Sequence, residues 1–167
     1  SWSFGMAPLP PFPQLFDKMP MEQQEKRLGY SEFKALSGEL AQLPSAHIPT
    51  IFKAIRTGDP YPVRTGFIFG NNALSTYGDV KTVYETLAAL DYLAVAELYM
   101  TPTAEIADLI LPVATWAEVD ALPAVPFYGQ NVIMAQQKTF QYAECIQDEE
   151  IMTEICRRLG TEHGQES

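Results

Sequence analysis

Polar side chains stand at the ends of predicted strands, where they could bind a small ligand. Asn71 and Asn72 follow one apolar strand, and Glu97 follows the next. An amide both donates and accepts hydrogen bonds, so asparagine suits the edge of a heterocyclic base, but it is also a common turn residue. The carboxylate of Glu97 could accept a pair of N–H groups, as from guanine, or could simply be solvated.

Other candidates lie close to predicted helix starts. Asp148 opens the last predicted helix, so it could be a plain N-cap or could reach a ligand from there. Thr101 can cap a short helix that has Pro102 at its first position. Asp108 is expected to cap or pair locally. The segment Trp116-Ala117-Glu118 could line the same site, although an aromatic residue next to a strand more often belongs to the core.

Catalytic and metal-binding patterns are missing from the sequence. It contains no nucleophile–base set, and neither GxGxxG nor GxxxxGK[ST] occurs. Cys145 and Cys156 match no metal or redox spacing, so we expect ordinary thiols, with a disulfide or metal role as the alternative. His47 and His163 are expected to be surface or capping residues. The candidates therefore indicate binding rather than catalysis.

The composition limits the class of protein. The chain has 167 residues, 47% of them hydrophobic, and a net charge of −10. Such an acidic chain should repel nucleic acids and anionic membranes. No apolar run reaches the roughly 18 residues of a membrane span, so direct membrane insertion is not expected. The sequence opens without methionine in proline-rich sequence and shows no signal peptide, which suggests an excised fragment.

Alternating strands and helices indicate an α/β fold. The unbroken apolar run at 93–96 is typical of a strand covered on both faces. Strand 63–69, helix 79–90 and strand 92–97 form a βαβ unit, which gives a parallel pair. A helical turn at 102–107 then leads to a strand at 108–112. Because ligands bind at the carboxyl ends of such strands, 97–103 is the first candidate site.

The rest of the chain is expected to be less regular. Residues 1–29 are rich in proline and aromatics, which suggests a linker packed on another domain, a polyproline-type ligand or disorder. The further predicted elements are helices at 31–43 and 45–57, the second capped by Ser45 and ended by Gly58, a loop at 116–130, a strand at 132–136 and a helix at 148–159.

Three segments resemble the molybdopterin oxidoreductase family, which includes dimethyl sulfoxide reductase, polysulfide reductase, nitrate reductase and formate dehydrogenase. They are GFIFGNNAL, VAELYMTPTAEIADLILPVATWAEVDAL and ECIQDEEIMTEICRRLG. The middle one is the most specific, with T-x-T-A-x-x-A-D, then aliphatics, L-P and W-x-E. The resemblance runs from about Pro62 to Gly160.

The resemblance implies a Rossmann-like three-layer α/β/α domain with a mostly parallel sheet, preceded by a proline-rich irregular lead-in. It divides the chain into a lead-in and helix at 1–45, a molybdopterin-guanine-dinucleotide-binding domain at 46–160 and a polar tail at 161–167. Family members bind bis(molybdopterin guanine dinucleotide) between several domains. The family's iron–sulfur cysteine cluster, metal ligand and C-terminal barrel have no counterpart here, so the chain resembles a fragment of a catalytic subunit.

The family's pattern implies a pocket for one guanosine end of the cofactor. Carried over residue by residue, it is framed by Asn72, Glu97, Thr101 and Asp148. The chain departs from the pattern in three places. Ala73 replaces a proline, Glu97 replaces the commoner aspartate, and Val119 stands where some members have lysine.

The resemblance implies that the whole enzyme performs two-electron redox or oxygen-atom transfer at molybdenum or tungsten. Its expected partners are the remaining domains of the same subunit and an iron–sulfur electron-transfer subunit, in a bacterial or archaeal host. The alternative is a stand-alone Rossmann-like module that binds a nucleotide or a protein without catalysis.

The 167-residue chain alone should have no redox activity, because it lacks a cluster motif and a metal-ligand segment. Purified chain should not oxidise reduced viologen in the presence of oxyanions or sulfoxides, nor reduce an artificial acceptor with formate. Reproducible turnover by the metal-free protein would contradict the fragment hypothesis.

Overall fold

The computed structural model describes residues 20–41, 45–121 and 135–160. The chain divides into two compact units. The first unit comprises residues 1–65 and 81–91, and the second comprises residues 66–80 and 92–167. All four candidate binding residues lie in the second unit.

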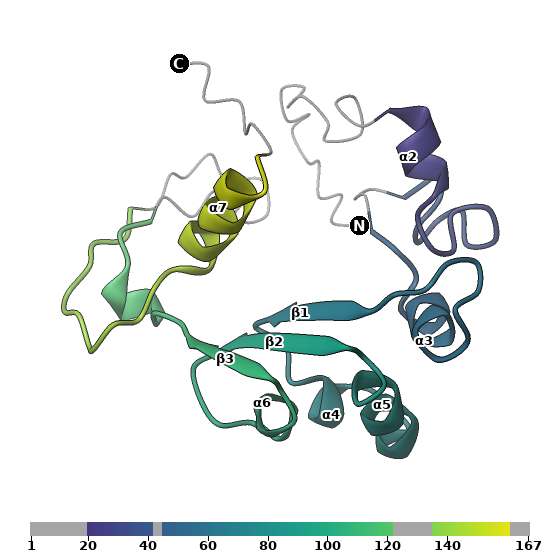
Figure 1. Cartoon of the computed structure of the whole chain (residues 1–167). Helices are drawn as coiled ribbons and strands as arrows, with labels where there is room; N and C mark the ends of the chain where they lie inside the picture. The colour runs from purple at the N-terminus through teal and green to yellow at the C-terminus, as the bar shows by residue number, and fades with distance from the viewer. Residues whose placement is uncertain (1–19, 42–44, 122–134, 161–167) are drawn as a thin grey trace, which may run out of the picture. The chain divides into compact units, whose positions relative to one another are not determined.

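A parallel sheet forms the centre of the second unit (Figure 1). Its strands are β1 (Thr65–Phe69), β2 (Tyr92–Glu97) and β3 (Leu109–Pro112), in the order β1-β2-β3. Four side chains of the central strand are almost fully buried, from Leu93 to Ala96, which confirms a strand covered on both faces. The predicted α/β fold is therefore correct.

The connection from β2 to β3 is short, and hydrogen bonds of Thr101 and Asp108 hold it in place. It contains α6 (Pro102–Glu105), where the Thr101 hydroxyl accepts the N–H of Ala104 at 3.2 Å, as the sequence predicts. Asp108 Oδ2 accepts the N–H of Leu93 at 2.7 Å, and the N–H of Asp108 donates to the Leu93 carbonyl at 2.9 Å. Asp108 was expected to cap or pair locally, but its partner is 15 residues away in the chain, so it holds the starts of the two strands together.

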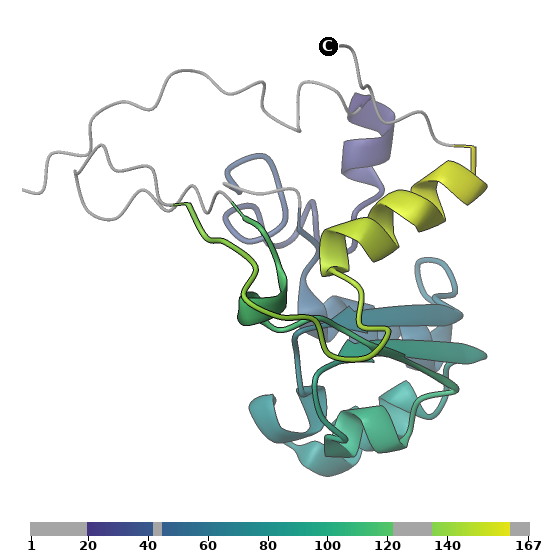
Figure 2. The same cartoon turned by 90° about the vertical axis from the view of Figure 1, so that its left-hand side faces the viewer.

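Helices lie on both faces of this sheet. The one-turn helices α4 (Ala73–Thr76) and α6 lie on one side, and α7 (Asp148–Arg158) lies on the other (Figures 1 and 2). The α7 face has a core of Ala96, Val113 and Ile151, with Phe67, Phe69, Leu111 and Ile155 packed against it. The inward faces of Ile151 and Ile155 were predicted, but Leu159 is exposed because the helix ends before it.

In the described residues beyond β3, 113–121 and 135–160, the chain forms isolated bridges rather than a further strand. A 3-10 turn, η1 (Trp116–Glu118), follows β3, and single bridges join Val113 to Ile146 and Ala121 to Gln136. Of the strand predicted at 132–136, residues 132–134 lie outside the described residues.

The first unit contains α2 (Met21–Glu25), α3 (Ile48–Thr57) and α5 (Val80–Leu87). The helix predicted at 31–43 is wrong over its described part, which forms successive turns. Gly38 contributes to this, because glycine lowers helix propensity. In the turns that form instead, Gly38 lies against Tyr30 and Lys34, where a side chain would collide with their main-chain atoms.

The start of α3 also differs from prediction. Ser45 does not cap the helix, since its hydroxyl donates to the Leu36 carbonyl at 2.8 Å. His47 is the N-cap, with its Nδ1 atom 2.9 Å from the Thr50 hydroxyl and its ring stacked on Phe33. Gly58 ends the helix in a left-handed conformation, as predicted.

The buried stripe of α5 is narrower than predicted. Val83, Thr86 and Leu87 are buried, but Val80 and Tyr84, expected on the inner face, are about half exposed. Thr86 can be buried because its hydroxyl donates to the Thr82 carbonyl at 2.7 Å. Within the residues that the structure describes, no helix is long and apolar enough to cross a bilayer.

Replacing Leu87 by alanine should lower the free energy of unfolding by roughly 2–5 kcal/mol, because the side chain is only 6% exposed and its loss leaves a cavity. Tyr84→Ala, on the exposed side of the same helix, is the matched control. Urea denaturation monitored by circular dichroism measures both. If Leu87→Ala lowers the free energy of unfolding by less than about 1 kcal/mol, Leu87 is not part of the hydrophobic core.

Candidate functional site

Asn72 lies at the N-terminus of α4 and connects it to α6. Its Oδ1 atom accepts a hydrogen bond from the Thr103 hydroxyl at 2.7 Å, and its Nδ2 atom donates to Ser75 Oγ at 2.9 Å. Its main-chain carbonyl accepts the N–H groups of Ser75 and Thr76. The side chain is half-buried. Helix α4 was not predicted, since a four-residue helix has too short a periodic pattern to be recognised.

Thr101 lies on the same side of the unit as Asn72. It caps α6, two residues before the Thr103 that contacts the Asn72 amide. Two of the four predicted site residues are therefore brought together at the starts of two short helices.

Glu97 and Asp148 form the second pair. Glu97 ends β2 opposite Pro112 of β3, is half-buried, and accepts the N–H of Leu98 at 2.8 Å through Oε1. Asp148 is the first residue of α7, and Gln147 rather than Asp148 is the N-cap. Burial raises the pKa of Asp148, and the negative charges of Glu149 and Glu97 raise it further. Ala96, the residue before Glu97, packs against Ile151 of α7, so the end of β2 and the first turn of α7 lie near each other.

Glu118, which the sequence offered with Trp116 as a possible lining of the site, is a buried carboxylate, whereas Trp116 is exposed. Glu118 is 5% exposed and forms a capping box with Thr115, whose N–H donates to Oε2 at 3.0 Å. Its Oε1 atom accepts the N–H of Tyr142 at 2.6 Å, and these hydrogen bonds lower its pKa. The pattern T-x-x-E at 115–118 is a capping-box signal that could have identified it. Its role is to join η1 to the segment that precedes α7.

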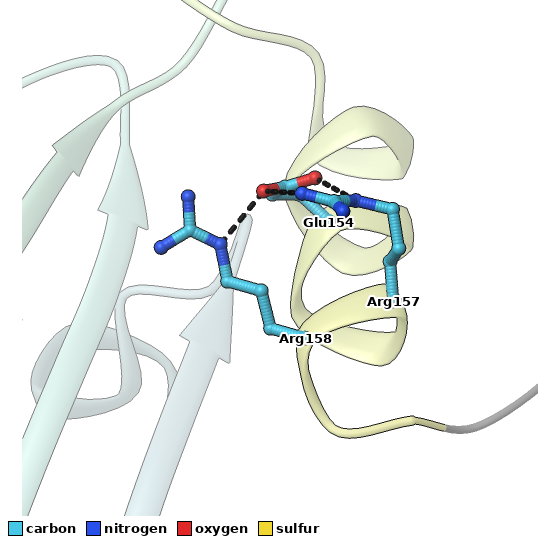
Figure 3. Close-up of polar contacts among 3 residues, drawn as sticks. All are labelled: Glu154, Arg157 and Arg158. Atoms are coloured by element: carbon cyan, nitrogen blue, oxygen red, sulfur yellow. Dashed lines mark hydrogen bonds and ion pairs between the residues drawn. The ribbon is translucent and has the colours of Figure 1, made fainter.

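Glu154 has a strongly perturbed pKa that does not indicate a site. Arg157 and Arg158 donate to its two oxygens, at 2.7–2.8 Å, on the surface of α7 (Figure 3). They lower its pKa to about 2. Both arginines are more than two-thirds exposed, and all three residues lie on one helical face at i, i+3 and i+4 spacing. These are two solvent-exposed ion pairs that share Glu154 on one helix, and such pairs contribute little stability.

The thiols belong to no metal-ligand cluster in the described part of the chain. Neither Cys145 nor Cys156 forms a disulfide, and both thiols are half-buried. Within residues 20–41, 45–121 and 135–160, no three histidine, cysteine, aspartate or glutamate side chains are grouped as metal ligands would be. His163 lies outside these residues.

The comparison with family models decides the assignment. A model described as molybdopterin oxidoreductase matches residues 24–158. The chain belongs to the molybdopterin oxidoreductase family. The match includes both carboxylates of the Glu97–Asp148 pair and the Asn72–Thr103 contact.

Individual members of the family are similar over much of the chain. A dopamine dehydroxylase of Eggerthella lenta is 33% identical over 141 residues, which are 84% of this chain and 13% of that protein. The alpha subunit of a formate dehydrogenase from Methanocaldococcus jannaschii is 32% identical over 94 residues, 56% of this chain and 14% of that protein.

A solved structure supports the fold. Acetylene hydratase from Pelobacter acetylenicus superimposes with a TM-score of 0.71 and 24% identity, over 88% of this chain and 23% of that protein. The chain therefore spans less than a quarter of the length of each of these relatives.

Glu118 should make stability depend on pH. Because its pKa is lowered on folding, the stabilisation is present above its ordinary value of 4.5 and is lost as pH falls below it. Glu118→Gln should be less stable than wild type at pH 7 and should lose part of the decline in stability between pH 5 and pH 2. The exposed Glu144→Gln, in the same segment, is the control. Equal pH profiles for Glu118→Gln and wild type, from thermal melts, would rule out this role.

Proposed function

We propose that the second unit binds the guanosine end of bis(molybdopterin guanine dinucleotide) within the catalytic subunit of a molybdenum or tungsten oxidoreductase. The observation that carries the proposal is the position of Glu97 at the carboxyl end of the central parallel strand, where Ala96 packs against Ile151 in the helix that Asp148 begins. Open α/β sheets bind ligands at this end of their strands. Family membership supplies the class of cofactor.

The chemistry of the pair fits guanine. Guanine presents N1–H and N2–H₂ as adjacent donors, and an ionised carboxylate accepts only. One oxygen of Glu97 already accepts the N–H of Leu98, which orients the group and leaves Oε2 and a further lone pair of Oε1 for a ligand. Adenine has an acceptor at N1 and no donor at C2, so Glu97 would select against it.

Asp148 adds a reason for a donor-rich ligand. Its raised pKa reflects burial together with the charges of Glu149 and Glu97. A base that places N–H groups beside these carboxylates would reduce their mutual repulsion, whereas an anionic group would increase it. The nucleotide would therefore bring its base, and not its phosphate, to Glu97 and Asp148.

Asn72 and Thr101 would then lie towards the sugar or phosphate. Their neutral side chains provide hydrogen bonds without a positive charge, and Val119 stands where some family members have lysine. A free nucleotide should therefore bind weakly, with a dissociation constant of about 1 mM, or about −4 kcal/mol.

In the whole protein, the cofactor would supply the two-electron redox or oxygen-atom-transfer chemistry, and the residues of this chain would hold and orient its nucleotide end. Further domains of the same subunit would complete the binding site. An iron–sulfur electron-transfer subunit is a fitting partner, because one relative is the alpha subunit of a formate dehydrogenase. The names of the relatives refer to different substrates, so this unit would serve a shared cofactor rather than a shared substrate.

A stand-alone interaction module is the alternative. Tyr99, Met100 and Trp116 are 63–76% exposed, and such side chains suit contact with further protein. Sequencing the gene around this segment separates the two hypotheses. A longer reading frame with an N-terminal CxxCxxxC-type cluster supports the first, and a start codon at Ser1 with a stop after Ser167 supports the second.

Titration of ¹⁵N-labelled chain with GMP should shift amide resonances at 70–73, 97–103 and 148, and AMP should shift them less. Glu97→Gln should weaken GMP binding at least tenfold, because hydrogen bonds to charged groups contribute roughly 1.5–3 kcal/mol. Glu144→Gln, an exposed acid outside the proposed site, should bind like wild type. Equal shifts with GMP and AMP, or an unchanged affinity in Glu97→Gln, would refute guanine recognition by Glu97.

A further inference from the structure

A buried hydroxyl, that of Thr103, is hydrogen-bonded to the side-chain amide of Asn72. Thr103 is fully buried in α6, and its Oγ1 atom contacts two groups that lie far from it in sequence. The main-chain N–H of Leu74 donates to Oγ1 at 3.0 Å. The distance from Oγ1 to the side-chain oxygen Oδ1 of Asn72 is 2.7 Å. All three residues belong to the second unit.

The direction of these hydrogen bonds follows from the chemistry of a hydroxyl. A threonine hydroxyl has one proton and two lone pairs. The Leu74 N–H can only donate, so it occupies one lone pair. Among the described residues, the acceptor within reach of the proton is Asn72 Oδ1. If the amide were rotated by 180°, its NH₂ group would face Oγ1 and the buried proton would have no acceptor.

The orientation of the amide has a consequence for binding. With Oδ1 held by Thr103, the NH₂ group lies on the other side, where one N–H donates to Ser75 Oγ at 2.9 Å. The second N–H is left for a ligand. The Ser75 oxygen accepts from Asn72, so its own proton is also available to an acceptor. Ser75 is exposed and Asn72 is half-buried.

We infer that Thr103 is a positioning residue that orients the Asn72 amide, so that Asn72, with Ser75 beside it, presents hydrogen-bond donors to an acceptor oxygen of the nucleotide. This inference rests on the proposed function and divides the nucleotide between two pairs of residues. The donor edge of the base meets the carboxylates of Glu97 and Asp148, and a phosphate or ribose oxygen meets Asn72 and Ser75.

Three variants test the inference. Thr103→Val keeps the shape of the side chain but removes the hydroxyl, Thr103→Ser keeps the hydroxyl, and Asn72→Asp keeps the acceptor for Thr103 but removes the donor. The side-chain NH₂ resonances of Asn72 provide a readout without ligand. They should move and broaden in Thr103→Val, because the amide can rotate, and should return close to their wild-type positions in Thr103→Ser.

The affinities for GMP, guanosine and 9-methylguanine show whether Asn72 contacts a phosphate oxygen or a ribose oxygen. If Asn72 contacts the phosphate, Thr103→Val and Asn72→Asp should weaken GMP several-fold and leave guanosine unchanged. If it contacts the ribose, both GMP and guanosine should weaken while 9-methylguanine does not. Thr103→Ser should bind all three like wild type. Asn72→Asp gives the affinity test even if Thr103→Val fails to fold.

Different results would overturn the proposed guanosine binding and the positioning role of Thr103. Wild-type chain that binds no GMP would overturn the proposed function and the ligand contact, whatever the state of the amide. Unchanged Asn72 NH₂ resonances in a folded Thr103→Val would overturn the positioning role, even if GMP binds. Equal weakening of 9-methylguanine and GMP in Asn72→Asp would place Asn72 at the base and contradict the assignment to sugar or phosphate.

Discussion

The paired hydrogen bonds between Leu93 and Asp108 are the constraint on which the second unit depends. The Asp108 side chain accepts the first buried N–H of β2, and its main-chain N–H returns a hydrogen bond to the same residue. This fixes the register of β2 and β3, so that Glu97 lies opposite Pro112 at the far end. A slip by one residue would turn every side chain of β3 to the other face. The position of Glu97 at the end of β2 therefore depends on the carboxylate of Asp108, which lies at the start of the β2–β3 strand pair.

Packing against α7 completes the geometry of the carboxylate pair. Ala96 is small and fully buried, which lets Ile151 of α7 approach the sheet closely. This contact brings the first turn of that helix, which Asp148 begins, towards the end of β2. Glu118 secures the preceding segment through the N–H of Tyr142, so the entry to α7 is held by a buried carboxylate with satisfied hydrogen bonds. Asp108 and Glu118 thus hold the strand pair and the helix entry on which Glu97 and Asp148 lie.

Local patterns in the sequence predicted the sheet well. The apolar run before Glu97 gave β2 its correct bounds, and the T-P pair gave the start of α6. The helix predicted at 31–43 is wrong although its leucines are periodic, because the chain turns so that Gly38 lies against main-chain atoms of Tyr30 and Lys34 and two of the leucines are exposed. The role of Thr103 could not be seen from spacing, since its partner Asn72 is 31 residues away in the chain. Contacts of this kind depend on the folded arrangement of α4 and α6.

The central claim is that the Glu97 carboxylate binds the donor edge of guanine. The most direct measurement is a crystal structure of the 167-residue chain grown with GMP. The account predicts electron density for the base at the carboxyl end of β2, with N1 and N2 within about 3.2 Å of the Glu97 carboxylate oxygens. Well-ordered GMP bound elsewhere, or bound here with its phosphate against Glu97, would contradict it.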